Sequence, residues 1–229
     1  MPKHVRYVGP ILDDPQWAEP WHAPWPDGNH DPLVLVGFSS TFQDQAPVLR
    51  SVVKALAGLR VRALVTLGEM LPEGEVQSTG SVVVVRSAPH GEILRQASLL
   101  ITHCGHGTTL KALAAGVPIV CMPMGRDQND TAARVVHASA GVRLRLRSPA
   151  KKIAKAVAQV LADVRYRANA RRVGEAIARE LGDQVDLVAE LEKMPLLRSS
   201  QVDRHGRGGG AVTGLVDSVH LDRVHDAEG

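Results

Sequence analysis

Short runs of consecutive apolar residues alternate along the chain with stretches in which apolar residues recur every three or four positions. The runs are typical of strands buried in a parallel sheet, and the stretches are typical of helices with one buried face. The predicted strands cover residues 33–38, 61–67, 81–86, 98–103, 117–122 and 141–146. The predicted helices cover residues 46–59, 91–97, 108–115, 129–140, 150–161, 164–181 and 184–192. This alternation predicts an α/β fold, with a parallel Rossmann-like sheet flanked by helices.

The two ends of the chain lack this alternation. Residues 1–32 are rich in proline and contain all 3 tryptophans, a composition that excludes a regular helix or a central strand. Residues 197–229 are polar, without pattern, and include the run GRGGG. We therefore predict a proline-rich interdomain linker (1–32), one Rossmann-like domain (33–196) and a disordered tail (197–229).

Composition narrows the class of protein further. Apolar residues make up 44% and aromatic residues only 3%, so the core is built mainly from aliphatic side chains. The net charge of +3 is a mild excess, and few aromatics are present to stack on bases, so no nucleic-acid partner is expected. The start has no signal-peptide pattern, and no apolar run approaches the roughly 18 residues that span a bilayer. These features predict a cytoplasmic protein.

The stretch THCGHGTTLKALAAGVPIVCMPMGRDQND, residues 102–130, carries the densest chemistry. His103, Cys104 and His106 lie too close together for the usual spaced pairs of zinc ligands, and no second pair follows. A catalytic cysteine normally meets its histidine from a distant part of the chain. Cys104 therefore fits better as a small thiol packed beneath a loop, and no metal site is predicted.

A dinucleotide-binding turn is a further alternative. The segment GHGTTL, residues 105–110, follows a predicted strand and opens a predicted helix, as that motif requires. Leu110, however, stands where a third glycine would let the helix pack closely on the strand, and no acidic residue ends the next strand. The sequence therefore disfavours an NAD-binding site without excluding it.

A phosphate-binding turn fits the same residues best. Gly105 and Gly107 let the backbone approach a ligand closely. Thr108 and Thr109 fall in the first turn of the predicted helix, where N–H groups without partners and the helix dipole attract anions. His103, at the end of the preceding strand, adds one more donor. This set suits a diphosphate.

Other loops reach the same edge of the sheet, because the carboxyl ends of parallel strands meet there. Ser40 and Thr41 follow the first strand, and the loop 87–90 follows the third. Asp127 and Gln128 follow the strand 117–122. A carboxylate beside an amide suits the vicinal hydroxyls of a sugar ring. The edge is therefore predicted to bind a sugar linked to a diphosphate.

The run HCGHGTTLKALAAGVPIVCMPMGRDQ resembles the signature HCG-x-x-ST-x-E-x-x-x-x-GVP-x-x-x-x-P-x-x-x-DQ of family 1, GT-B-fold glycosyltransferases, above all the macrolide- and antibiotic-type enzymes. The segment VGFSST resembles the first strand and loop of their C-terminal domain, and SAPHGEIL resembles their W-x-P-Q-x-x-x-L segment. The segment VRYVGPILDD resembles their interdomain stretch. The resemblance covers about residues 5–191 and implies the C-terminal, donor-binding half of a GT-B fold.

By this resemblance the partner is a UDP- or dTDP-hexose, transferred with inversion to a hydroxyl without a metal or other cofactor. The loop 87–90 would frame the nucleobase, and Asp127 and Gln128 would bind the sugar. The diphosphate would be bound by Ser40, His103, Gly105, Gly107, Thr108 and Thr109. The full set of implied donor-binding residues is Ser40, Thr41, Ser87, Ala88, His90, His103, Gly105, His106, Gly107, Thr108, Thr109, Asp127 and Gln128. The resemblance assigns the catalytic base to an N-terminal domain, so no catalytic residue is expected in this chain.

The sequence departs from the family pattern at three positions and in its length. His106 stands where Trp, Ala or Met is common, and its role stays open. Lys111 stands where many UDP-sugar enzymes have a glutamate that binds the ribose hydroxyls, which leaves dTDP as an option. Ser87 replaces an aromatic residue that stacks on the base, so weaker base binding is expected. Met1 falls at the linker, so we expect a truncated donor half.

Such a donor half would pair with a separate acceptor-domain subunit or form a homodimer. Two alternatives stay open from the sequence. The first is a non-catalytic homologue that serves as a sugar-nucleotide-binding or protein-interaction module. The second is an epimerase of the same fold or an NAD-binding protein.

Overall fold

The computed structural model describes residues 9–10, 12, 14, 20–38, 44–69, 71–72 and 74–182. Two predicted donor contacts, Ser40 and Thr41, lie outside the described residues, as do the predicted helix 184–192 and the predicted tail.

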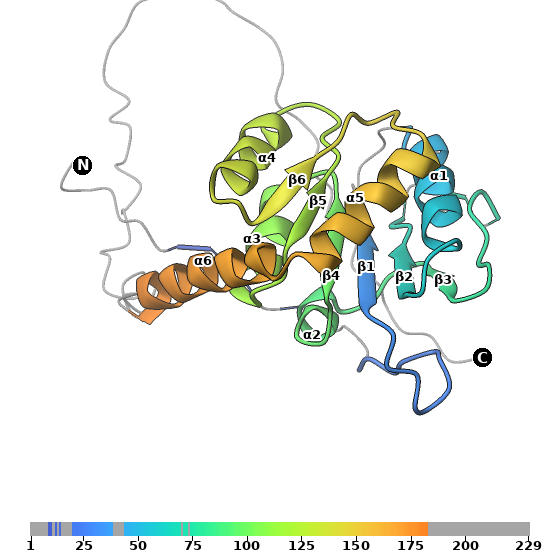
Figure 1. The fold of residues 1–229 in the computed structure, drawn as a ribbon, viewed down its shortest axis with the longest axis horizontal. Helices are drawn as coiled ribbons and strands as arrows, with labels where there is room; N and C mark the ends of the chain where they lie inside the picture. The colour runs from blue at the N-terminus through green and yellow to red at the C-terminus, as the bar shows by residue number, and fades with distance from the viewer. Residues whose placement is uncertain are drawn as a thin grey trace, which may run out of the picture.

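Strands and helices alternate through the described part of the chain, as the hydrophobic pattern predicts (Figure 1). The strands are β1 (Leu33–Gly37), β2 (Arg62–Thr66), β3 (Val82–Val85), β4 (Leu99–Thr102), β5 (Ile119–Cys121) and β6 (Gly141–Arg143). The helices are α1 (Ala46–Leu56), α2 (His90–Leu94), α3 (His106–Ala114), α4 (Gln128–His137), α5 (Ala150–Ala162) and α6 (Val164–Gly182). The predicted α/β class with a parallel sheet is therefore confirmed.

The six strands pair in parallel in the order β3-β2-β1-β4-β5-β6. Side chains of β1 alternate between two buried layers. Val34 and Val36 face a core shared with α1 and α5, and Leu33 and Leu35 face a core shared with α2, α3, α4 and α6. Figure 1 shows α5 crossing one face of the sheet. Because the strand order reverses between β1 and β4, their carboxyl ends frame the crevice where open α/β sheets bind ligands.

Residues 9–32, called here the N-terminal segment, contain neither helix nor strand among their described residues, as their prolines predict. This segment nevertheless contacts the domain directly. Trp25 Nε1 donates a hydrogen bond to the Ser81 carbonyl at 2.9 Å, and the Trp21 N–H donates to the Glu92 carboxylate at 3.1 Å. Lys111 Nζ lies 2.7 Å from a carboxylate oxygen of Asp14. These contacts place the segment beside α2 and α3.

Candidate functional site

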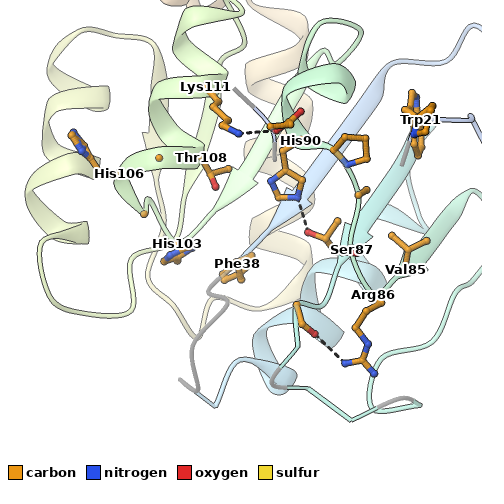
Figure 2. Close-up of a pocket in the computed structure, with 18 of the residues that line it drawn as sticks. Trp21, Phe38, Val85, Arg86, Ser87, His90, His103, His106, Thr108 and Lys111 are labelled. Atoms are coloured by element: carbon orange, nitrogen blue, oxygen red, sulfur yellow. Dashed lines mark hydrogen bonds and ion pairs between the residues drawn. The ribbon is translucent and has the colours of Figure 1, made fainter. Parts of the chain in front are cut away.

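A cavity of about 1070 Å³ opens at the carboxyl ends of β1, β2, β3 and β4. Its lining comes from the N-terminal segment, the strand ends, the β3–α2 loop and the turn between β4 and α3, as Figure 2 shows in part. Eight of the predicted site residues line it, namely Ser87, Ala88, His90, His103, Gly105, His106, Gly107 and Thr108. The structure thus brings the two predicted loops, which are far apart in sequence, to one cavity.

The chain turns sharply from β4 into α3. Cys104 adopts a left-handed φ of 68°, and its N–H donates to Thr102 Oγ1 at 3.4 Å. The Cys104 side chain is fully buried in the core and does not line the cavity. This burial agrees with the sequence interpretation of Cys104 as a packed thiol, because a buried thiol offers no nucleophile to a ligand.

The first turn of α3 faces the cavity. The helix begins at His106, two residues earlier than the sequence predicted, with Gly105 as its N-cap and no side chain capping it. The N–H groups of His106, Gly107 and Thr108 therefore have no acceptor within the helix, as in the first turn of any helix. The N–H of Thr109 is already bonded to the Gly105 carbonyl at 3.1 Å.

Gly105 and Gly107 both leave room at this turn that a side chain would occupy. A Cβ on Gly105 would lie 2.6 Å from His103 Nε2, so only glycine lets the imidazole lie against the turn. A Cβ on Gly107 would meet no atom of the described residues within 4 Å, apart from its own neighbours in the helix, so these residues leave the space beside it open. An anion can therefore approach the free N–H groups, where the helix dipole stabilises negative charge.

His103 lies beside this turn and stacks on Phe38, with ring centroids 6.1 Å apart. Burial lowers the pKa of His103, and this effect outweighs the hydrogen bond to the Gly37 backbone and the charge of Asp127, which both raise it. The imidazole is therefore mostly neutral at pH 7. An incoming anion would favour its protonation, because negative charge nearby stabilises the imidazolium.

His90 has a different setting at the start of α2. Its Nε2 lies 3.0 Å from Thr66 Oγ1, and that hydroxyl donates to the Val36 carbonyl at 3.2 Å. Because the hydroxyl has one proton, Nε2 must be the donor to Thr66. Burial lowers the pKa of His90 to about 4, with a smaller upward effect of Asp14 and a downward effect of Lys111. His90 is thus a neutral, packed imidazole that joins the β3–α2 loop to β1 and β2.

Three predicted site residues do not line the cavity. Thr109 is buried, and its Oγ1 has no hydrogen-bond partner among the described residues. Gln128 is buried, and its Oε1 accepts from the N–H groups of Met124 and Gly125 at 2.8 and 3.1 Å. Its side chain therefore fastens the loop between β5 and α4. Asp127 is exposed on that loop, near enough for its charge to act on His103.

Sequence reasoning missed the wall that the N-terminal segment adds. Asp14, Trp21 and His22 line the cavity with Lys111 and Arg86. Asp14 and Lys111 form an ion pair between residues 97 positions apart, and their side chains are only 20% and 16% exposed. Such a long-range pair leaves no spacing pattern in the sequence. The apolar stretch within residues 5–12 was the single hint that this segment lies against the domain.

Within the described residues, no group of three or more His, Cys, Asp or Glu side chains is arranged to hold a metal ion. Likewise, none of the helices in the described part combines the length and apolar character needed to cross a bilayer.

The fold is a parallel α/β domain with a cavity at the carboxyl ends of its strands. Residues 50–194 match the family described as Erythromycin biosynthesis protein CIII-like, C-terminal domain, and the chain belongs to this family. It is 33% identical over 197 residues to 4'-demethylrebeccamycin synthase of Lentzea aerocolonigenes, an alignment that covers 83% of this chain and 46% of that relative. It is 31% identical over 197 residues to demethyllactenocin mycarosyltransferase of Streptomyces fradiae, with coverage of 81% and 42%.

A solved structure agrees with these relatives. The calicheamicin glycosyltransferase CalG4 superposes with a TM-score of 0.67 at 28% identity, over 76% of this chain and 43% of that chain. The predicted resemblance to antibiotic-type glycosyltransferases of the GT-B fold is confirmed. The chain spans less than half the length of each of these proteins.

Proposed function

We propose that this chain binds a nucleoside diphosphate sugar, a UDP- or dTDP-hexose, as the donor half of a glycosyltransferase. The observation that carries the proposal is the open first turn of α3 at a cavity of about 1070 Å³. The N–H groups of His106, Gly107 and Thr108 bind the diphosphate, with His103 beside them. A cavity of this size suits a nucleotide sugar better than a lone phosphate.

The sugar is proposed to lie toward the loop between β5 and α4. Support comes from Asp127, whose exposed carboxylate acts on His103 at the diphosphate end. Gln128 supports the loop from within, because its amide oxygen is bonded to two backbone N–H groups. We therefore assign direct sugar contact to Asp127 and loop positioning to Gln128, while Ser40 and Thr41 are proposed to complete the site from the loop after β1.

The proposed reaction is metal-independent, inverting transfer of the hexose to an acceptor hydroxyl, with a base from an acceptor-binding part outside this chain. That part is a separate subunit or belongs to a longer protein, and a homodimer is the other arrangement. Two observations support the proposal that the base lies outside this chain. The relatives are more than twice as long as the matched region, and two of the four histidines that line the cavity, His90 and His103, already bond to the protein through Thr66 and the Gly37 backbone. The chain alone is therefore expected to bind donor without cleaving it.

Isothermal titration calorimetry tests donor binding directly. UDP-glucose, dTDP-glucose and NADH are titrated in turn into the full chain. We expect one site with a Kd of about 1 mM or tighter, roughly −4 kcal/mol, for at least one sugar nucleotide. No heat with either sugar nucleotide at several times that concentration overturns the proposal, and heat with NADH alone favours the dinucleotide alternative.

Two further measurements examine the roles within the site. Asp127→Ala should weaken binding of the sugar nucleotide about fivefold and leave free UDP unchanged, because only the sugar meets that carboxylate. An equal loss for both ligands would contradict the assignment. UDP release from UDP-glucose should stay at the rate without protein, and release above that rate would place a base in this chain.

A further inference from the structure

The N-terminal segment forms the end of the cavity that lies away from the first turn of α3. Figure 2 shows Trp21 at one end and His106 and Thr108 at the other, with Lys111 and His90 between them. Trp21 packs against the same apolar layer as Val85 and Ala88. The cavity therefore has an anion-binding end, a charged middle and an apolar, aromatic end.

This order matches the order of groups in a nucleoside diphosphate, in which the pentose joins the diphosphate to the base. With the diphosphate at His106–Thr108, the pentose passes the Asp14–Lys111 ion pair and the base reaches Trp21 and Ala88. The inference rests on the proposed function, because it uses the same diphosphate position.

We propose that two residues of the N-terminal segment recognise the nucleoside. The Trp21 ring contacts the base, and the Asp14 carboxylate accepts a hydrogen bond from a pentose hydroxyl. The segment is then part of the donor site and determines which nucleoside binds, in addition to leading into β1.

Asp14 is placed to accept this hydrogen bond. One of its oxygens lies 2.7 Å from Lys111 Nζ, the other accepts from the Glu92 N–H at 3.2 Å, and the Gly91 N–H also donates to this carboxylate. A carboxylate has about four acceptor positions, so these contacts leave room for a hydroxyl. Lys111 has only donors and cannot accept from a hydroxyl. Asp14 is therefore the acceptor of the pair.

Trp21 and Trp25 differ in a way that identifies the ring that contacts the ligand. The two rings are in edge contact, with centroids 6.2 Å apart. Trp25 Nε1 is bonded to the Ser81 carbonyl, and the Arg62 guanidinium lies 5.5 Å from the Trp25 ring centre. Trp25 does not line the cavity, whereas Trp21 does, and Trp21 Nε1 has no partner among the described residues. No side-chain hydrogen bond to the described residues fixes the Trp21 ring, so it can adjust to a stacked base.

Calorimetry with UDP and with inorganic pyrophosphate, which has no nucleoside, tests Trp21. Trp21→Leu should weaken UDP binding about tenfold, because stacking of a base on an aromatic ring is lost. The same variant should bind pyrophosphate within about twofold of the unchanged chain, which also shows that it is folded. Trp25→Leu is the matched control, with UDP affinity within about twofold.

Asp14→Asn is tested with the same two ligands, and Asp31→Asn is its control in the same segment. The substitution should weaken UDP binding about fivefold, because a charged acceptor is lost. It should leave pyrophosphate binding unchanged or tighter, because a negative charge near the anion is removed.

Three outcomes count against the inference. Wild-type UDP affinity in both Trp21→Leu and Asp14→Asn overturns it and leaves the proposed function standing. Equal weakening of UDP and pyrophosphate overturns the nucleoside assignment. Binding of neither ligand by the unchanged chain removes the proposed function and this inference together.

Discussion

The two ends of the cavity are built in different ways. The end that we propose to bind the diphosphate, called the diphosphate end, comes from one turn between β4 and α3, within residues 103–108. The end that we propose to bind the nucleoside, called the nucleoside end, is assembled from the N-terminal segment, the β3–α2 loop and Lys111. The first is local in sequence and depends on backbone N–H groups, whereas the second depends on side chains brought together by the fold. A change at the first end should therefore act on every diphosphate, and a change at the second should act on nucleosides.

The largest expected effect is on anion binding at the diphosphate end, where one substitution should weaken binding without lowering stability. Gly107→Asp places a carboxylate near the first-turn N–H groups of α3, where a Cβ meets no atom of the described residues within 4 Å outside its own helix. The melting temperature should stay equal or rise, because the interaction of the carboxylate with the helix dipole stabilises the helix by about 0.5 kcal/mol. The substitution should weaken the binding of UDP and of pyrophosphate alike by at least roughly 100-fold, about 3 kcal/mol, because the new carboxylate repels the anion.

Gly107→Ala is the control for this change, because it adds a methyl group without charge. Its affinity should fall far less than that of Gly107→Asp. A Gly107→Asp variant that still binds pyrophosphate like the unchanged chain would show that the anion lies elsewhere.

The next effect concerns the buried imidazole behind the nucleoside end. The pKa of His90 is lowered to about 4 by burial, so the unfolded chain binds this proton more readily than the folded protein. The contribution of the neutral His90 imidazole to the free energy of unfolding is complete above about pH 6.5 and is lost as the pH falls toward 4. At pH 4.5 the loss from this residue is about 2.5 kcal/mol.

Urea unfolding at pH 7.0 and at pH 4.5 measures this contribution. His90→Gln keeps a donor for Thr66 but does not titrate. Its free energy of unfolding should therefore fall by about 2 kcal/mol less than that of the unchanged chain over this interval. Equal losses for both proteins would show that His90 is not neutral in the folded state.

The smallest effect concerns the attachment of the N-terminal segment. Burial raises the pKa of Asp14, but the Lys111 hydrogen bond and the N–H groups of Gly91 and Glu92 outweigh it, so the pKa is lowered overall. A double-mutant cycle of Asp14→Asn and Lys111→Met should give a coupling of about 1 kcal/mol in the free energy of unfolding.

The ion pair between Asp31 and Arg60 supplies the comparison for this cycle, because the Arg60 side chain is 95% exposed. The equivalent cycle there should give no measurable coupling. Similar couplings for the two pairs would mean that Asp14 and Lys111 are no better fixed than a surface pair.

The hydrophobic pattern predicted the sheet well, because the central strands β1, β4 and β5 are largely apolar and fully buried. The edge strands β3 and β6 are only partly buried. The start of α3 was misplaced by two residues, since Gly105 caps the helix where Gly107 seemed the last loop residue. Asp127 and Gln128 were predicted as a pair. Neighbouring residues at a helix start point in different directions, however, and here one is exposed and the other is buried.

The nucleoside end was predicted only in part. The loop 87–90 was expected there, and Ser87 predicted weaker base binding, but no local pattern predicts that Trp21 lines the same cavity. Lys111 was interpreted alone, although its charge is paired with Asp14. Both contacts depend on how a segment without helix or strand crosses the domain, and periodicity does not predict that path.

The central claim is that a sugar nucleotide binds with its diphosphate on the first turn of α3. Amide chemical-shift mapping by NMR, with UDP added to the full chain, tests it most directly. We predict that the N–H signals of His106, Gly107 and Thr108 shift most, followed by those of residues 87–90. Absence of shifts at millimolar UDP would contradict the account, as would shifts centred on the basic groove of Arg143, Arg145 and Lys152.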